Sequence, residues 1–78
     1  MLIVTLGAAD DDVEVREDQL TTITEAQLEM LGMSRDTLAQ VFKDTAELMK
    51  DVKPGERVRP VAKELPDGTW KVFLFATD

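Results

Sequence analysis

Between Thr24 and Ser34 the chain carries a run of helix start and stop signals that leaves few choices of fold. Thr24 and Gln27 have the spacing of a capping box, in which each side chain bonds the backbone amide of the other residue. Gly32 stands where a short helix over residues 25–31 would end, because glycine readily takes the left-handed conformation that closes a helix. Ser34 can then cap a second helix. The sequence therefore predicts two helices joined by a tight corner.

A single apolar stripe after Ser34 predicts the second helix. Apolar residues recur three, four and seven positions apart, and Thr45 fills the one gap in the stripe. Pro54 and Gly55 are expected to end the helix. The predicted buried positions are Leu38, Val41, Phe42, Leu48, Met49 and Val52.

The segment before the helices has the pattern of strands. Residues 2–6 are apolar and rich in β-branched side chains, and we expect Gly7 to end that strand. Residues 8–12 are expected to form a loop, because three consecutive aspartates repel one another. Residues 13–16 alternate between apolar and charged side chains, which predicts a second short strand that pairs back on the first.

The segment after the helices is predicted to be a hairpin. Residues 57–65 and 69–76 flank the Pro-Asp-Gly sequence at 66–68, which fits a type I turn with its glycine in the left-handed conformation. Pro60 favours an edge position in the sheet, and Trp70 is expected to belong to the core. Apolar residues on both faces of the last strand indicate either an interior strand or a face reserved for a partner. One face holds Trp70, Val72, Leu74 and Ala76, and the other holds Phe73 and Phe75.

Together these segments predict one α+β domain over residues 1–78, with the element order β(β)ααββ. Its sheet is antiparallel or mixed with two helices packed on one face, and the strand order stays open. The chain has no cysteine, so this core must form without disulfides. No apolar run approaches the roughly 20 residues of a membrane span, and no signal-peptide pattern opens the chain. We therefore expect a cytoplasmic protein without a membrane partner.

Charge is divided unevenly along the chain. Of 16 acidic and 9 basic residues, residues 1–30 hold eight acidic and one basic, which accounts for the whole net charge of −7. Solubility does not require such clustering, so the acidic residues are candidates for binding a basic partner surface. These candidates are Asp10, Asp11, Asp12, Glu14, Glu17 and Asp18. A local basic excess follows later, at Lys50, Lys53, Arg57, Arg59 and Lys63.

The sequence contains no recognisable catalytic or cofactor-binding constellation. Histidine and cysteine are absent, and the one serine, Ser34, is better used as a helix cap. We therefore expect no catalytic residue, no cofactor and no enzymatic activity.

The acidic residues match a calcium-binding pattern only in part. Asp10, Asp12 and Glu14 occupy the first, third and fifth positions of an EF-hand loop. However, Val15 stands at the sixth position, where the loop needs glycine, and Thr21 at the twelfth, where it needs glutamate. The pattern favours a solvated acidic loop over a metal site, with a looser Mg²⁺ or Ca²⁺ site as the alternative.

Residues 24–42 also have a second interpretation. Within them, Leu-Gly-Met-Ser-Arg-Asp-Thr-Leu at 31–38 resembles the turn and the start of the recognition helix in the helix-turn-helix segment of bacterial regulators. The resemblance implies that Arg35, Thr37 and Gln40 face the major groove of DNA, with the later hairpin as a basic wing. The alternative is that the same residues form a simple corner between two helices.

Three functions follow from these patterns. The first is a non-enzymatic acidic module, an inhibitor or regulator that occupies a basic patch on a nucleic-acid-handling protein. In size and charge it resembles the anti-CRISPR and anti-restriction proteins of phages. The second is a winged-helix-like DNA-binding regulator, although direct nucleic-acid binding is disfavoured by the excess of acidic residues. The third is a self-assembling subunit, in which the acidic part of one copy meets the basic part of the next in a head-to-tail ring. A homodimer also stays open, since a DNA-binding module of this size would need one.

Overall fold

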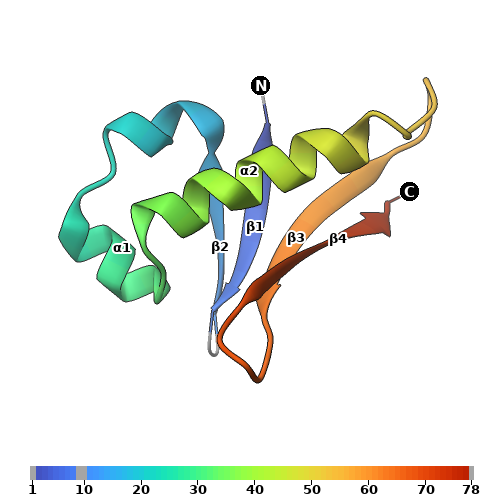
Figure 1. Cartoon of the computed structure of the whole chain (residues 1–78). Coiled ribbons are helices and arrows are strands. Elements are labelled where there is room, and N and C mark those ends of the chain that lie inside the picture. The colour runs from blue at the N-terminus through green and yellow to red at the C-terminus, as the bar shows by residue number, and fades with distance from the viewer. Residues whose placement is uncertain (1, 9–10, 78) are drawn as a thin grey trace.

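A hairpin at each end of the chain and a pair of helices between them make up the domain (Figure 1). The computed structural model describes residues 2–8 and 11–77. Its elements are β1 (Ile3–Ala8), β2 (Asp11–Arg16), the short 3₁₀ helix η1 (Glu17–Thr21), α1 (Glu25–Leu31), α2 (Arg35–Met49), β3 (Val58–Glu64) and β4 (Trp70–Ala76). This order confirms the predicted α+β fold, including the second strand.

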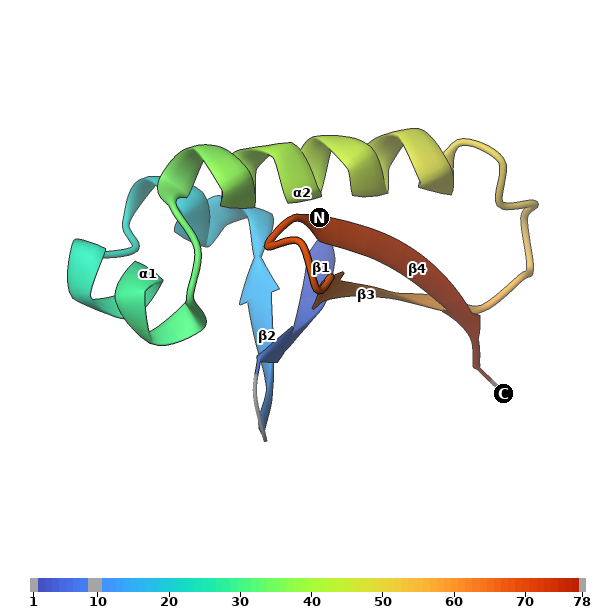
Figure 2. The same cartoon turned by 60° about the horizontal axis from the view of Figure 1, so that its bottom comes forward.

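The two hairpins join through one parallel pairing to form a mixed sheet. The strand order is β2-β1-β3-β4, with antiparallel pairing inside each hairpin and parallel pairing between β1 and β3. At this junction Thr5 pairs with Val61, and Leu6 pairs with Ala62. α2 lies across one face of the sheet, with α1 beside its N-terminal end (Figure 2). Within the described residues, the other face of the sheet carries no helix.

The helix caps form as the sequence predicts. The hydroxyl of Thr24 accepts a hydrogen bond from the Gln27 amide at 3.2 Å, and the Gln27 side chain accepts one from the Thr24 amide at 2.8 Å. Gly32 closes α1 with φ 77°, in the left-handed region. The Ser34 hydroxyl accepts a bond from the amide of Thr37 at 3.2 Å and so caps α2. The corner between the helices is therefore set by local hydrogen bonds.

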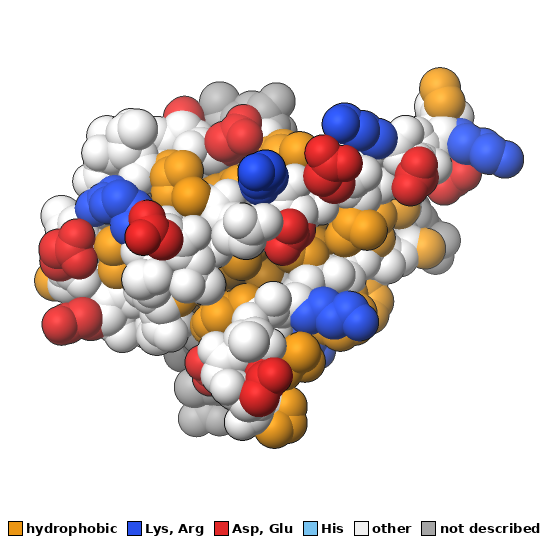
Figure 3. Space-filling view, in the orientation of Figure 1, with side chains coloured by type: hydrophobic (Ala, Val, Ile, Leu, Met, Phe, Trp, Pro, Cys, Tyr) orange, Lys and Arg blue, Asp and Glu red, His pale blue; other side chains and the backbone are white. Residues whose placement is uncertain are grey.

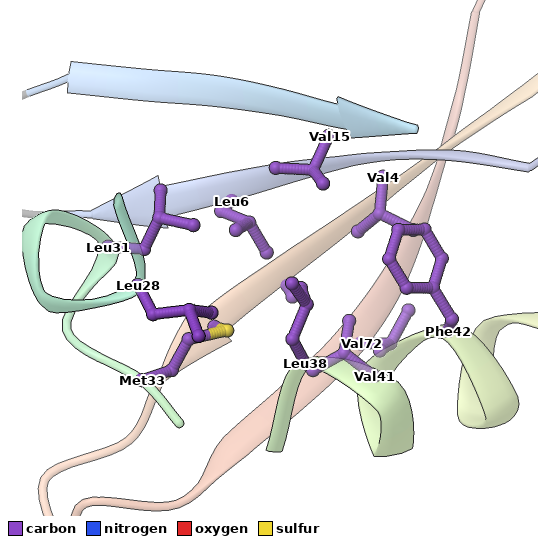
Figure 4. Close-up of a cluster of buried hydrophobic side chains, with 11 residues drawn as sticks. Val4, Leu6, Val15, Leu28, Leu31, Met33, Leu38, Val41, Phe42 and Val72 are labelled. Carbon is purple, nitrogen blue, oxygen red and sulfur yellow. The ribbon is translucent and has the colours of Figure 1, made fainter. Parts of the chain in front are cut away.

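The core lies between α2 and the covered face of the sheet (Figure 4). Leu6 and Leu38 are 0% exposed at its centre. Thr45 is also fully buried, and its hydroxyl donates to the carbonyl of Val41 at 2.7 Å. This bond satisfies the one polar group in the predicted apolar stripe. The clustered side chains are Val4, Leu6, Val15, Leu28, Leu31, Met33, Leu38, Val41, Phe42, Ala62 and Val72.

α2 ends earlier than the sequence predicts. Its last residue is Met49, so Val52 lies outside the helix, and Leu48 is 38% exposed. The amides of Asp51 and Val52 instead close single turns to the carbonyls of Leu48 and Met49, at 3.3 and 3.2 Å. Pro54 disfavours helical geometry at the residue before it, which explains why the chain leaves the helix ahead of the proline.

The first hairpin is longer than predicted. β1 passes through Gly7 instead of ending there, and β2 begins at Asp11. Gly7 pairs with Asp12, so cross-strand pairing prevails over the low strand propensity of both residues. The predicted loop over 8–12 is therefore wrong, apart from residues 9 and 10, which lie outside the described residues.

The strand order excludes one of the two alternatives for β4 and corrects the expected edge position of Pro60. β4 is an edge strand, so its apolar residues do not mark an interior position. β3 is an interior strand although it contains Pro60. The proline is tolerated because the register with β1 begins at the next residue, Val61, and the missing N–H falls outside that pairing.

The turn between β3 and β4 is confirmed. Gly68 has φ 89°, and its amide donates to the carbonyl of Leu65 at 2.9 Å. One carboxylate oxygen of Asp67 accepts from the hydroxyl of Thr69 at 2.6 Å and from its amide at 3.0 Å. These two bonds hold the pKa of Asp67 below its usual value, and the bond from the Thr69 hydroxyl has the larger effect.

We predict that Leu38→Ala destabilises the domain by about 2–5 kcal/mol, because its side chain is fully buried and leaves a cavity. Met30→Ala is the matched control, since Met30 is 84% exposed, and it should change the free energy of unfolding by less than about 0.5 kcal/mol. Urea unfolding followed by the fluorescence of Trp70 measures both variants. Equal unfolding midpoints would contradict this description of the core.

Candidate functional site

One face of the sheet, here called the open face, is covered neither by α2 nor by another helix of the described residues. Val4, Val15 and Val72 point into the core, so their neighbours along each strand point to the open face. The register sets Glu14, Thr5, Val61 and Phe73 in one row across the four strands. The open face comprises Ile3, Thr5, Gly7, Asp12, Glu14, Arg16, Arg59, Val61, Lys63, Lys71, Phe73 and Phe75.

The middle of the open face is buried, and exposed apolar side chains lie around it. Thr5 and Val61 are each only 4% exposed, although no helix in the described chain covers them. Around them Ile3 and Phe75 are 45% exposed, and Phe73 is 36% exposed. Their neighbours on the same face therefore shield the central pair, and the large side chains around it remain in contact with solvent.

Two lysines lie against the exposed aromatic rings. The Lys71 ammonium is 5.5 Å from the ring centroid of Phe73, and the Lys63 ammonium is 6.0 Å from that of Phe75. Both distances are within the range of cation–π attraction. The long lysine stems also cover part of the apolar surface, so the rings are partly shielded from water.

Charge is segregated across the open face. Asp12 and Glu14 lie on β2 at one side, with Arg16 at the end of that strand, and Arg59 and Lys63 lie on β3. The strand between them, β1, has the sequence Ile-Val-Thr-Leu-Gly-Ala and carries no charge. Because neighbouring strands are about 4.8 Å apart, roughly 10 Å separates the acidic strand from the basic one. The face is therefore acidic at β2 and basic towards β4.

The structure distributes the acidic candidates along one edge of the molecule. Asp12 and Glu14 are exposed on β2, and Glu17 and Asp18 are exposed on η1, directly after it. We call these four residues the acidic edge. Asp11 belongs to β2, whereas Asp10 lies outside the described residues.

Among the described residues, most carboxylates of the acidic edge have no cation beside them. Arg16 is 3.4 Å from Asp18, and this is the one ion pair among the described residues that involves the edge. Asp12, Glu14 and Glu17 make none there. In residues 2–8 and 11–77, no three Asp or Glu residues are grouped in a way that could hold a metal ion. The arrangement therefore presents separate carboxylates to solvent.

The predicted DNA-contacting residues are used largely within the chain. Arg35 donates to the carbonyls of Leu20 and Ile23, both at 2.6 Å, and lies 3.6 Å from a carboxylate oxygen of Glu25. The guanidinium therefore ties α2 to η1 and to the segment just after it, and a role for Arg35 in contacting DNA stays a prediction.

Thr37 and Gln40 also bond within the chain. The hydroxyl of Thr37 accepts from Ser34 at 2.9 Å, and the amide group of Gln40 donates to Asp44 at 2.8 Å. Nor does the second hairpin form a separate wing. Its Arg59 lies on the open face, which is turned away from α2. The helix and the hairpin therefore do not present one continuous DNA-binding surface.

Sequence reasoning did not identify the open face as a unit, since its four strands come together only through the β1–β3 pairing. The one signal in the sequence was the alternation along β4, which places Phe73 and Phe75 on the opposite face from Trp70. Trp70 is indeed half-buried against the core, whereas the two phenylalanines are exposed.

Comparison with known proteins adds no assignment: no family model, no curated protein and no solved structure matches the chain. None of the helices in the described residues is long and apolar enough to cross a membrane.

We predict that Arg35→Ala lowers the free energy of unfolding by about 1–3 kcal/mol, because it leaves two carbonyl groups without their donor. Lys43→Ala, an exposed cation on the same helix, should change it by less than about 0.5 kcal/mol. Thermal or urea unfolding measures both. If the two variants were equally stable, Arg35 would not hold α2 in place.

Proposed function

We propose that the protein is a non-enzymatic cytoplasmic binding module that uses its acidic edge to occupy a basic surface on a nucleic-acid-handling protein. The observation that supports this most directly is the row of exposed carboxylates on β2 and η1, of which Asp12, Glu14 and Glu17 have no ion-pair partner among the described residues. Charges that are not neutralised within the chain remain available to a partner.

The geometry of the edge suits a surface that evolved to bind phosphates. Asp12 and Glu14 point to the same face and lie about 7 Å apart along the strand. They form a spaced pair of anions on one extended strand, as successive phosphates do along a nucleic-acid strand. A basic surface bound in this way is closed to nucleic acid, so the expected role is that of an inhibitor or regulator, similar in kind to the small acidic inhibitors of phages.

The alternative of a DNA-binding regulator has less support. The three candidate residues of α2 are bonded within the chain, and Arg59 of the second hairpin faces away from that helix. Protein–DNA affinity depends on basic groups that reach phosphates.

The test compares two variants that change net charge equally. The edge variant is Asp12→Asn, Glu14→Gln and Glu17→Gln. The control variant is Asp51→Asn, Glu56→Gln and Glu64→Gln, three exposed acidic residues outside β2 and η1. Each is immobilised beside the wild type, incubated with nuclease-treated cell lysate, and its retained proteins are quantified by mass spectrometry.

We expect the wild type and the control variant to retain the same basic nucleic-acid-binding protein and the edge variant to lose it. With that protein purified, the edge variant should associate at least about tenfold more slowly at low salt, because steering by charge acts mainly on the association rate. Equal retention and equal association rates for the two variants would contradict the proposal.

A further inference from the structure

The two edges of the sheet are protected very differently. β2 has the sequence Asp-Asp-Val-Glu-Val-Arg, and charged side chains of this kind discourage pairing with another strand. β4 has the sequence Trp-Lys-Val-Phe-Leu-Phe-Ala, with Lys71 as its single charge and no acidic residue. An apolar strand of this length at an open edge is a template for a further strand.

Two backbone bonds show which groups of β4 face the open edge. The amide of Thr77 donates to Arg57 at 2.8 Å, and the carbonyl of Thr69 accepts from Leu65 at 2.7 Å. Backbone groups alternate sides along an antiparallel strand, so Lys71, Phe73 and Phe75 also bond towards β3. The residues whose N–H and C=O groups point to the free edge are therefore Trp70, Val72, Leu74 and Ala76.

We propose that this edge binds a second copy of the chain, with the two β4 strands antiparallel about a two-fold axis at Phe73. Only a register centred on Phe73 pairs all four outward-facing residues within the strand. It sets Val72 opposite Leu74 and Trp70 opposite Ala76 of the other copy. Centring the axis on Val72 or Leu74 would place one of these residues opposite a chain segment beyond β4.

The side chains of the open face are self-complementary in this register. Phe73 meets Phe73 of the other copy at the axis, and Lys71 lies opposite Phe75. The Lys71–Phe75 pairing therefore resembles the lysine–phenylalanine contact already present within one chain, where Lys71 is 5.5 Å from the ring of Phe73. Aromatic pairs across neighbouring strands stabilise sheets.

Apolar surface on the covered side of β4 adjoins the same edge. Hydrophobic side chains are visible there, in the band between α2 and the second hairpin (Figure 3). Trp70 and Leu74 are only half-buried, and Leu48 of α2 is 38% exposed. A second copy at the edge would cover part of this surface as well as the backbone groups.

The charge distribution permits this pairing despite a net charge of −7 on each copy. β2 lies three strand spacings from β4, about 14 Å away, which exceeds the Debye length of about 8 Å at physiological ionic strength. The acidic strands would form the two outer edges of the joined sheet. Both acidic edges would therefore remain accessible, and the dimer does not depend on the proposed function.

The first test is the molar mass in solution, measured by sedimentation over a concentration series up to about 1 mM. The wild type should reach twice the 8.7 kDa of one chain. Phe73→Lys should stay monomeric, because it brings two ammonium groups together at the axis. Ile3→Lys is the matched control, since Ile3 is equally a large exposed residue of the open face but lies on β1, and it should still dimerise.

The second test determines the register between the two β4 strands by cysteine cross-linking. In the proposed pairing the two copies of residue 73 form a non-hydrogen-bonded pair about 4.5 Å apart at Cα, within the range of a disulfide. Phe73→Cys should therefore form a disulfide-linked dimer in a glutathione redox buffer. Phe75→Cys should not, because its two copies are offset by about 13 Å along the strands.

A wild type that stays monomeric at every concentration would overturn the proposal and leave the edge to a strand of a different protein. Cross-linking of Phe75→Cys as fast as Phe73→Cys would overturn the register. Circular dichroism of each variant confirms that it is folded before either result is interpreted.

Discussion

The parallel pairing between β1 and β3 is the contact on which the rest of the structure depends. A single hairpin is at best marginally stable in water, and each half of this chain supplies only one. Joining them through Thr5–Val61 and Leu6–Ala62 creates a four-stranded sheet broad enough for α2 to cover. The buried core then forms between that helix and one face, and the helices serve as the crossover that a parallel connection requires.

The same pairing gives the sheet two unlike edges. It places the acidic β2 at one side and the apolar β4 at the other, with the uncharged β1 next to the acidic strand. The charged edge resists pairing with other strands and presents carboxylates, whereas the apolar edge presents unpaired backbone groups. A chain with a large net negative charge can therefore offer two separate contact surfaces, one for a basic partner and one for a second copy.

The sequence was informative wherever a few neighbouring residues decide the structure. The caps at Thr24 and Ser34 and the turn at Gly68 depend on bonds within a few positions, so they could be predicted. The strand order could not, because it depends on residues far apart in the chain. For that reason β4 was open to two interpretations. The contacts of Arg35 could not be predicted either, because its partners, in η1 and just after it, lie in a segment that has no recognisable sequence pattern.

The most direct test of the central pairing is an isotope-edited NOESY spectrum of the protein at low concentration. Parallel pairing predicts cross-peaks between amide protons of residues 61–63 in β3 and α-protons of residues 5–7 in β1, together with antiparallel cross-peaks inside each hairpin. Cross-peaks that connect β1 with β4, or an absence of any between β1 and β3, would contradict the account of both edges.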